Sequence, residues 1–381
     1  MKFNYEKLGN LIKISETKNK DLTVTNLVGM NINKEFIPSV ANTIGTNLAR
    51  YKLIHENQFA CNLMHVGRDK SVVISLFTSK KPAIISPAYK VFEIKNKDIL
   101  LPKFLMMYFR RSEFDRLGWF YTDSSIRGSL DWAKFCDIDI PIPKLEIQEK
   151  IVKIYEFLNY RIKLKERINK NLLQLSKVIF KKWFVEFEPF GGIQPNDWKN
   201  CSLNDVCDLK AGGDKPHIVS DEITNKCIYP IYSNGLDEDG LYGYTNQAKI
   251  FEESVTVSAR GTIGFVCLRH IPYVPIVRLI SVIPKKEFIS AKYLYLFLDR
   301  LNIIGTGTTQ QQLTIPDFKK TEILVPTLDV IESFTSQVNP IFEKIWIQED
   351  EIKKLSKLRD TLLPKLMSGE IDILEINSYL E

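Results

Sequence analysis

Side chains able to carry metal or acid–base chemistry are few in this chain and poorly grouped. Its four histidines have no ligand spacing: His55, His65, His217 and His270. Its six cysteines form no C-x-x-C pair, which predicts buried, reduced thiols and no metal site. Glu93 and Lys95 form an E-x-K, but the nearest preceding aspartate is Asp69. We therefore interpret the pair as the solvated edge of a strand rather than as a nuclease centre.

The motifs of stand-alone DNA-processing enzymes are absent as well. An adenine methyltransferase needs a glycine-rich cofactor loop and an Asn/Asp-Pro-Pro-aromatic motif beside the flipped base, and neither occurs. The phosphate loop G-x-x-x-x-G-K-S/T of ATP-driven motors is also missing. We therefore expect a chain that is not an enzyme and that needs no cofactor of its own.

Polar side chains suited to DNA recognition lie near glycine-containing turns. Arginine can donate two hydrogen bonds to guanine, Asn and Gln can pair similarly with adenine, and Lys, Ser and Thr suit phosphates. The candidates in the first half are Arg50, Tyr51, Lys52, Asn62, Arg68, Lys80, Lys81 and Arg127. Those in the second half are Lys215, Asn234, Tyr244, Arg260, Thr262, Arg278, Gln310 and Gln311. Each could also be an ordinary exposed polar residue, but glycine lets backbone approach a duplex closely, which favours DNA contact for the groups.

Length, charge and hydropathy are those of a globular protein with several domains. The 381 residues predict two to three domains. The net charge of +6 permits a polyanionic partner without requiring one. No apolar run approaches the roughly 18–20 residues of a membrane helix, and the N-terminus lacks the apolar core of a signal peptide. We expect a cytoplasmic protein without membrane contact.

The elements that must position these residues occur twice. At an offset of 183 positions, identical residues such as Leu130 and Leu313 coincide without a gap over more than fifty positions. The segment Lys103–Phe109 (KFLMMYF) likewise corresponds to Lys292–Leu298 (KYLYLFL). A strand-like edge followed by a long amphipathic helix is repeated, whereas residues 47–69 have no convincing partner. A repeated scaffold with unlike surfaces is typical of two binding domains with different specificities.

Two long helices are predicted from apolar residues spaced three or four positions apart. The first begins near Glu146, runs for about 40 residues or on the order of 60 Å, and ends before Pro189. Each helix could simply face its own core, but two stripes of similar length bury each other most economically. This favours an antiparallel coiled coil. The residues expected to pack between the helices are Ile151, Ile154, Leu158, Leu172, Leu175, Ile345, Leu355, Leu358 and Leu362.

The expected fold class is α+β, with two globular α/β domains separated by the two long helices and an internal pseudo-two-fold repeat. The expected boundaries are 1–144 for the first α/β domain, 145–188 for the central spacer helix, 189–327 for the second α/β domain, and 328–381 for the distal spacer helix and C-terminal tail. In the first domain the sequence predicts strands at Val72–Phe77, Ala83–Ile85 and Val91–Ile94, and a helix at Lys103–Arg111.

Several strings resemble those of one known family. They are NLMHVGRD at Asn62–Asp69, ISPAY at Ile85–Tyr89, SARGTIGFV at Ser258–Val266, QLTIPDFKKTEILVP at Gln312–Pro326, SKVIFKKWF at Ser176–Phe184 and LRDTLLPKLMSGEI at Leu358–Ile371. The order of these strings along the chain resembles that of the specificity (S) subunit of type I restriction–modification systems, and the resemblance covers essentially the whole length of the chain. The resemblance implies a non-catalytic protein with two target-recognition domains, each binding one half of a split double-stranded DNA target. It also implies spacer helices that dock two methyltransferase (M) subunits and, through them, restriction (R) subunits.

Two other hypotheses remain open at this stage. A coiled-coil scaffold that binds no nucleic acid would use the same helices, and a single-chain restriction or modification enzyme would need the motifs that are missing. In the preferred hypothesis, a stiff helical spacer joins two DNA-binding domains that each bind weakly. Both domains can bind at once only when the length of the spacer matches the distance between the half-sites, roughly 35 Å or more. The expected target is therefore bipartite and asymmetric.

Overall fold

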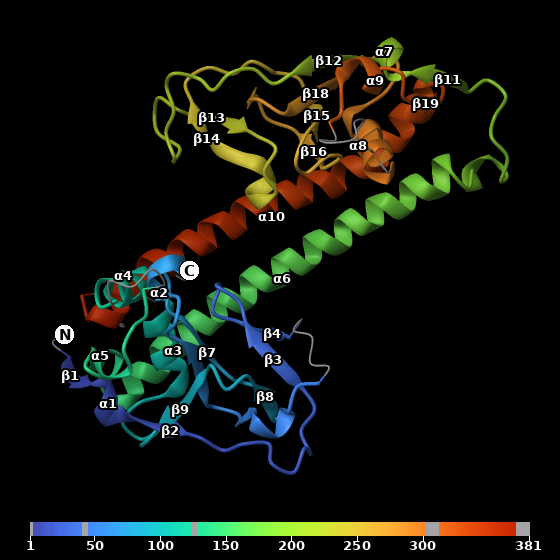
Figure 1. Cartoon of the computed structure of the whole chain (residues 1–381). Coiled ribbons are helices and arrows are strands. Elements are labelled where there is room, and N and C mark those ends of the chain that lie inside the picture. Colours follow the sequence, from blue (N-terminus) through green and yellow to red (C-terminus); the bar gives the residue numbers. More distant parts are fainter. Residues whose placement is uncertain (1–2, 40–44, 123–127, 302, 304–311, 371–381) are drawn as a thin grey trace. The chain divides into compact units, whose positions relative to one another are not determined.

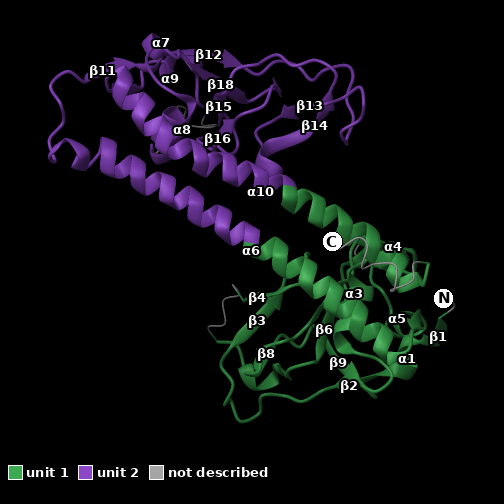
Figure 2. Cartoon of the chain, turned by 180° about the vertical axis from the view of Figure 1, so that it is seen from behind, with its two compact units in different colours: residues 1–164, 351–381 green, residues 165–350 purple. Residues whose placement is uncertain are grey.

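The structure is a computed structural model that describes residues 3–39, 45–122, 128–301, 303 and 312–370 (Figure 1). The chain forms two compact units, called unit 1 (residues 1–164 and 351–381) and unit 2 (residues 165–350). Figure 2 shows that each of the two long helices, α6 (Leu145–Phe184) and α10 (Leu328–Ser368), is divided between the units.

Unit 1 is built on three sheets. An antiparallel sheet has the order β2 (Ile12–Ser15), β9 (Lys90–Ile94), β6 (Phe59–Asn62) and β7 (Val73–Leu76). A second sheet has the order β4 (Phe36–Pro38), β3 (Leu27–Met30), β8 (Ala83–Ile85) and β5 (Lys52–Ile54). A short antiparallel pair joins β1 (Asn4–Lys7) to β10 (Asp139–Ile142). The three strands predicted in this region are thereby confirmed.

Aromatic side chains form the core of unit 1. Phe59 and Phe92 lie opposite each other on β6 and β9, and their rings stack with centroids 5.1 Å apart. Helix α3 (Pro102–Arg110) confirms the predicted helix and adds Phe109, which packs edge-on against Phe59 at 5.8 Å. Its proline stands at the first turn, where the missing N–H costs no hydrogen bond. The other helices are α1 (Leu8–Leu11), α2 (Val66–Asp69), α4 (Ser112–Phe120), α5 (Trp132–Cys136) and the 3₁₀ helix η1 (Leu48–Arg50).

Unit 2 has three sheets of the same kind. Its antiparallel sheet has the order β12 (Cys207–Ala211), β18 (Leu279–Pro284), β15 (Ser254–Ser258) and β16 (Val266–Arg269). A three-stranded sheet has the order β14 (Leu241–Thr245), β13 (Tyr229–Tyr232) and β17 (Val274–Pro275), and β11 (Lys199–Ser202) pairs with β19 (Glu322–Val325). The helices are α7 (Leu203–Val206), α8 (Ala291–Arg300), α9 (Ile315–Phe318) and the 3₁₀ helices η2 (Glu188–Phe190) and η3 (Asp237–Gly240).

The predicted internal repeat is confirmed by the sheet topology. The sheets β2–β9–β6–β7 and β12–β18–β15–β16 have the same order: the second strand of the unit pairs with the strand that precedes the apolar helix, and that strand pairs with a hairpin. The apolar helices are α3 and α8, which contain the two segments matched in the sequence. The small sheets differ, because unit 1 has an additional strand, β5, that pairs with β8.

The two long helices pack against each other in antiparallel fashion within each unit. In unit 1, Ile151 of α6 and Leu362 of α10 belong to one buried cluster. In unit 2, Phe180 and Phe184 of α6 contact Phe334 of α10, with ring centroids 6.1 and 4.8 Å apart. The start of each helix therefore packs with the end of the other, as predicted. No helix in the described ranges combines the length and the apolarity that crossing a bilayer requires.

Eight of the nine residues expected between the helices are at least partly buried. Ile151, Leu158, Ile345 and Leu362 are buried, and Ile154, Leu172, Leu355 and Leu358 are half-buried. Leu175 departs from the prediction, since it is 48% exposed. The buried face of α6 passes instead through Ser176 and Phe180. One residue corresponds to about 100° around a helix, so Leu175 points away from α10.

Candidate nucleic-acid interface

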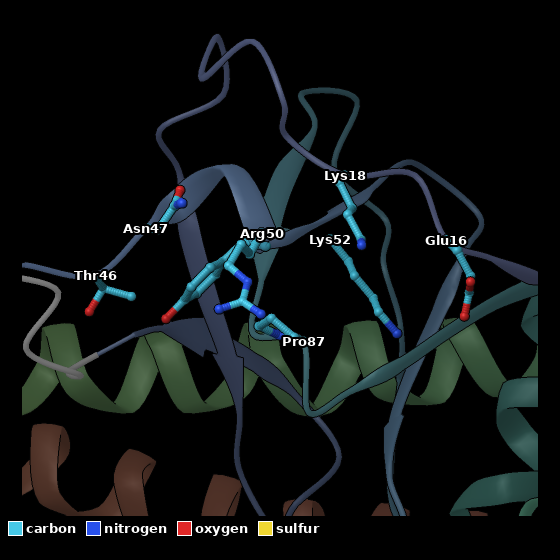
Figure 3. A pocket seen from close by; sticks show the side chains of 8 residues that line it. Glu16, Lys18, Thr46, Asn47, Arg50, Lys52 and Pro87 are labelled. Carbon is cyan, nitrogen blue, oxygen red and sulfur yellow. The ribbon is translucent and has the colours of Figure 1, made fainter.

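An open pocket of about 520 Å³ lies at one end of the sheet β2–β9–β6–β7 of unit 1 (Figure 3). Three segments that are distant in the sequence meet there: the residues that follow β2, the stretch from η1 into β5, and the turn between β8 and β9. The lining residues are Glu16, Lys18, Thr46, Asn47, Arg50, Tyr51, Lys52 and Pro87. Three of them are cations and one is a carboxylate.

Backbone hydrogen bonds hold these segments together. The Leu53 N–H donates to the Thr17 carbonyl at 2.8 Å, and the Asn19 N–H donates to the Tyr51 carbonyl at 3.0 Å. The side chain of Asn47 caps η1 by accepting from the Ala49 N–H at 3.0 Å. Capped and paired backbone fixes the directions of the side chains that leave it, so the pocket is preorganised.

The three cations of the pocket have different surroundings. The Lys52 ammonium donates to the Tyr89 carbonyl at 3.0 Å, and its burial lowers the pKa of this lysine below its usual value. Arg50 and Lys18 are exposed and form no ion pair within the described part of the chain. In Figure 3 the Lys52 side chain lies between Arg50 and Glu16. Lys52 is therefore partly a structural residue, whereas Arg50 and Lys18 are available to a ligand.

The corresponding sheet end of unit 2 is also crowded and cationic. The Gly212 N–H donates to the Leu279 carbonyl at 2.7 Å, which ties the end of β12 to the turn between β17 and β18. That turn carries Arg278, whose side chain is exposed and whose φ of 77° lies in the left-handed region. Its carbonyl accepts from the Ala259 N–H at 2.8 Å. A Cβ placed on Gly213 would lie 3.3 Å from the Lys249 ammonium, so this cation is at the same sheet end.

Several other predicted residues of unit 2 hold loops together. Asn234 donates from its side chain to the Arg260 carbonyl at 2.8 Å, and the Thr262 hydroxyl donates to the Asn234 carbonyl at 2.6 Å. The Lys215 ammonium bonds to the Tyr242 hydroxyl at 3.0 Å and lies 5.1 Å from the centre of that ring. These side chains therefore hold surface loops of unit 2 together. Tyr244 is half-buried on β14, and burial raises its pKa.

The remaining predicted residues of unit 1 lie apart from the pocket's lining. Arg68 forms an ion pair with Asp69 at 2.7 Å, and the Asn62 side chain accepts from the Met64 N–H at 3.0 Å. Lys80 and Lys81 are exposed between β7 and β8. Arg127, Gln310 and Gln311 lie outside the described residues.

Sequence reasoning grouped Arg50, Tyr51 and Lys52 but missed the rest of the pocket. The missed residues are Glu16, Lys18, Thr46, Asn47 and Pro87, together with Lys249 of unit 2. Lys18 reaches Lys52 only through an isolated β-bridge, which leaves no pattern in the local sequence. Within the described residues, no group of three or more His, Cys, Asp or Glu side chains could hold a metal ion.

Comparison with known proteins places the chain in one family. The family model described as type I restriction modification DNA specificity domain matches it twice, at residues 2–174 and 195–362. A Mycoplasma pneumoniae protein named as a putative type I specificity subunit is 30% identical to this chain over 219 residues. The match covers 57% of this chain and 58% of that protein, which is less than two thirds of its length. A second such protein of that organism is 31% identical over 261 residues, 66% of this chain and 76% of its own length.

More distant relatives agree over more of the chain. The specificity subunit of the type I restriction enzyme MjaIX of Methanocaldococcus jannaschii is 24% identical, over 78% of this chain and 75% of that protein. The crystal structure of a type I restriction–modification S subunit from M. genitalium superposes with a TM-score of 0.61, at 14% identity and over 96% of both chains. That structure shows a shared fold. The chain therefore belongs to the family of type I restriction–modification DNA specificity subunits.

Proposed function

We propose that unit 1 and unit 2 each recognise one half of a split, asymmetric double-stranded DNA target. The observation that carries this proposal is that the same end of the same sheet is cationic in both units. In unit 1 the cations are Lys18, Arg50 and Lys52, and in unit 2 they include Lys249 and Arg278. Phosphates require cations, and base edges require side chains that differ with the sequence. A repeated scaffold with unlike side chains suits two different half-sites.

Arg50 and Arg278, the exposed arginines at the two sheet ends, are the best candidates for base contacts. The arginine fork matches the two acceptors that guanine presents in the major groove. Arg278 adopts a left-handed backbone, which costs a residue with a Cβ about 1 kcal/mol. Such strain is commonly found at functional positions, and here it accompanies an exposed side chain at the cationic sheet end.

The faces of α6 that do not contact α10 support the docking of methyltransferase subunits. Each unit exposes its own group of apolar side chains on this helix, spaced three to seven positions apart. They are Phe157, Tyr160 and Leu164 in unit 1, and Ile168, Leu175 and Val178 in unit 2. Exposed apolar patches on a charged helix are typical of protein interfaces. We assign one M subunit to each patch, with the R subunits joining through them.

The proposed division of labour follows from these surfaces. Residues 1–144 and 189–327 act as target-recognition domains, 145–188 as the central spacer helix, and 328–381 as the distal spacer helix and tail. The chain contributes recognition, and its partner subunits contribute methylation and cleavage, including the restriction of phage DNA. The complex acts in the cytoplasm, where its DNA substrate is found.

Salt-dependent DNA binding tests this proposal. The purified chain, with its methyltransferase subunits, is titrated with a random-sequence duplex at two salt concentrations. Lys18→Ala and Lys249→Ala, which remove lysines of the two sheet ends, should each weaken binding and reduce the salt slope by about one. Lys97→Ala and Lys286→Ala are matched controls, because these exposed lysines lie beyond the opposite ends of β9 and β18. Equal effects of the two sheet-end variants and the two control variants would refute the placement of DNA at these sheet ends.

A further inference from the structure

Glu16 is the one lining residue of the unit 1 pocket whose charge opposes DNA. It follows β2 directly, and its side chain is exposed. Within the described part of the chain it forms no hydrogen bond or ion pair, although its charge favours the protonated form of the nearby Lys52. Glu16 therefore interacts with Lys52 only through its charge, and its carboxylate oxygens remain available to a ligand.

A carboxylate beside DNA is unfavourable unless it accepts a hydrogen bond from the DNA. Phosphate oxygens repel it, and the cations of the pocket compensate only part of that repulsion. The donors that a duplex offers in its major groove are the amino groups of cytosine and adenine. In a DNA complex, Glu16 therefore interacts favourably with the duplex where it meets one of these amino groups.

Cytosine fits the two oxygens of a carboxylate better than adenine does. In the major groove the adenine amino group lies beside N7, an acceptor that would face the second carboxylate oxygen. Cytosine has no acceptor beside its amino group in that groove, and its partner guanine presents two acceptors. Those two acceptors match the fork of Arg50, which lines the same pocket.

We infer that Glu16 is a specificity-determining residue of unit 1 that accepts a hydrogen bond from a cytosine amino group in the half-site bound at this pocket. This inference rests on the proposed function and deepens it. Lys52 holds the turn between β8 and β9 through the Tyr89 carbonyl, which keeps the pocket open beside Glu16. In unit 2, β12 ends at Ala211, which stands at the position that corresponds to Glu16 in the register of the two sheets, so the effect belongs to one half-site.

The test is genome-wide mapping of N6-methyladenine in cells that express the full chain with its methyltransferase subunits. The wild-type map should contain a C·G pair in the half-site that relaxes in Arg50→Ala. Glu16→Gln should broaden that single position to accept adenine, because an amide pairs with the adenine edge. Glu16→Ala should lose the preference for cytosine, about tenfold or more, without gaining adenine. Asp98→Asn, which changes an exposed carboxylate beyond the other end of β9, is the matched control.

The outcomes separate this inference from the function on which it rests. A wild-type map without any split motif that depends on this chain would overturn the proposed function. A split motif without a C·G pair in that half-site, or Glu16 variants that leave every position unchanged, would overturn the role of Glu16 alone. Uniform weakening at all positions in Glu16→Gln would also overturn it, because a base contact changes one position only.

Discussion

A methyl group added to Gly212 should disrupt the cationic end of unit 2. A Cβ at this residue would lie 2.0 Å from the Ile276 carbonyl oxygen and 2.6 Å from its carbon. Both atoms belong to the backbone, so no side-chain rotation can relieve the contact. The Gly212 N–H also donates to the Leu279 carbonyl, and the same strain therefore acts on both ends of the turn that carries Arg278.

The size of the effect follows from this geometry. Real Cβ contacts essentially never fall below 3.0 Å, so the two backbones must separate by about 1 Å. Overpacking usually costs 1–3 kcal/mol, and a rigid backbone neighbour places Gly212→Ala near about 3 kcal/mol. For a unit of this size that corresponds to a fall in Tm of roughly 6–12 °C.

The adjacent glycine provides the control. A Cβ on Gly213 would meet only the end of the Lys249 side chain, at 3.3 Å, and a flexible lysine can move away. Gly213→Ala should therefore change stability by less than about 1 kcal/mol. Thermal unfolding of the full chain measures the difference, and hydrogen exchange at the amides of β12 and residues 276–279 locates it. Equal unfolding temperatures for the two variants would refute the close-approach argument.

Two further predictions concern the core and the proposed docking surface. Lys34→Met should lower the free energy of unfolding by about 3 kcal/mol, because the buried Lys34 ammonium lies 2.8 Å from Asp115. Lys103→Met is the control, since it breaks only an exposed ion pair and should lower the free energy of unfolding by less than about 1 kcal/mol. Denaturant titration measures both values. Replacing Phe157 and Tyr160 with serine should reduce co-purification of the methyltransferase subunits while leaving binding of the isolated chain to a random-sequence duplex unchanged. Undiminished co-purification would exclude this patch from the interface.

The repeated scaffold was predictable because it depends on periodic local signals. Apolar residues three or four positions apart predicted α6 and α10, and β-branched runs predicted β7, β8 and β9. The prediction that Leu175 packs between the helices was wrong, because this leucine is exposed and the small Ser176 occupies the buried face of α6. Apolar character alone cannot distinguish the side of a helix that meets a neighbour from the side that remains open.

The candidate site was predictable only in part, because it assembles through long-range contacts. Arg50 was identifiable from its residue type and its position near a glycine turn, but Glu16 and Lys18 come from a segment about thirty residues earlier and have no motif. The close approach of Gly212 to Ile276 likewise joins residues that are far apart in the chain. Such contacts follow from the strand order of the sheets, which a single sequence does not encode locally.

The assignment of one half-site to each unit is tested by mapping N6-methyladenine in cells that express this chain with its methyltransferase subunits. We predict a split, asymmetric motif with a fixed spacer that disappears when the chain is deleted. We further predict that Arg50→Ala relaxes one half of the motif and Arg278→Ala the other half. Methylation that persists without the chain, a continuous motif, or two arginine variants that alter the same half would contradict the assignment of one half-site to each unit.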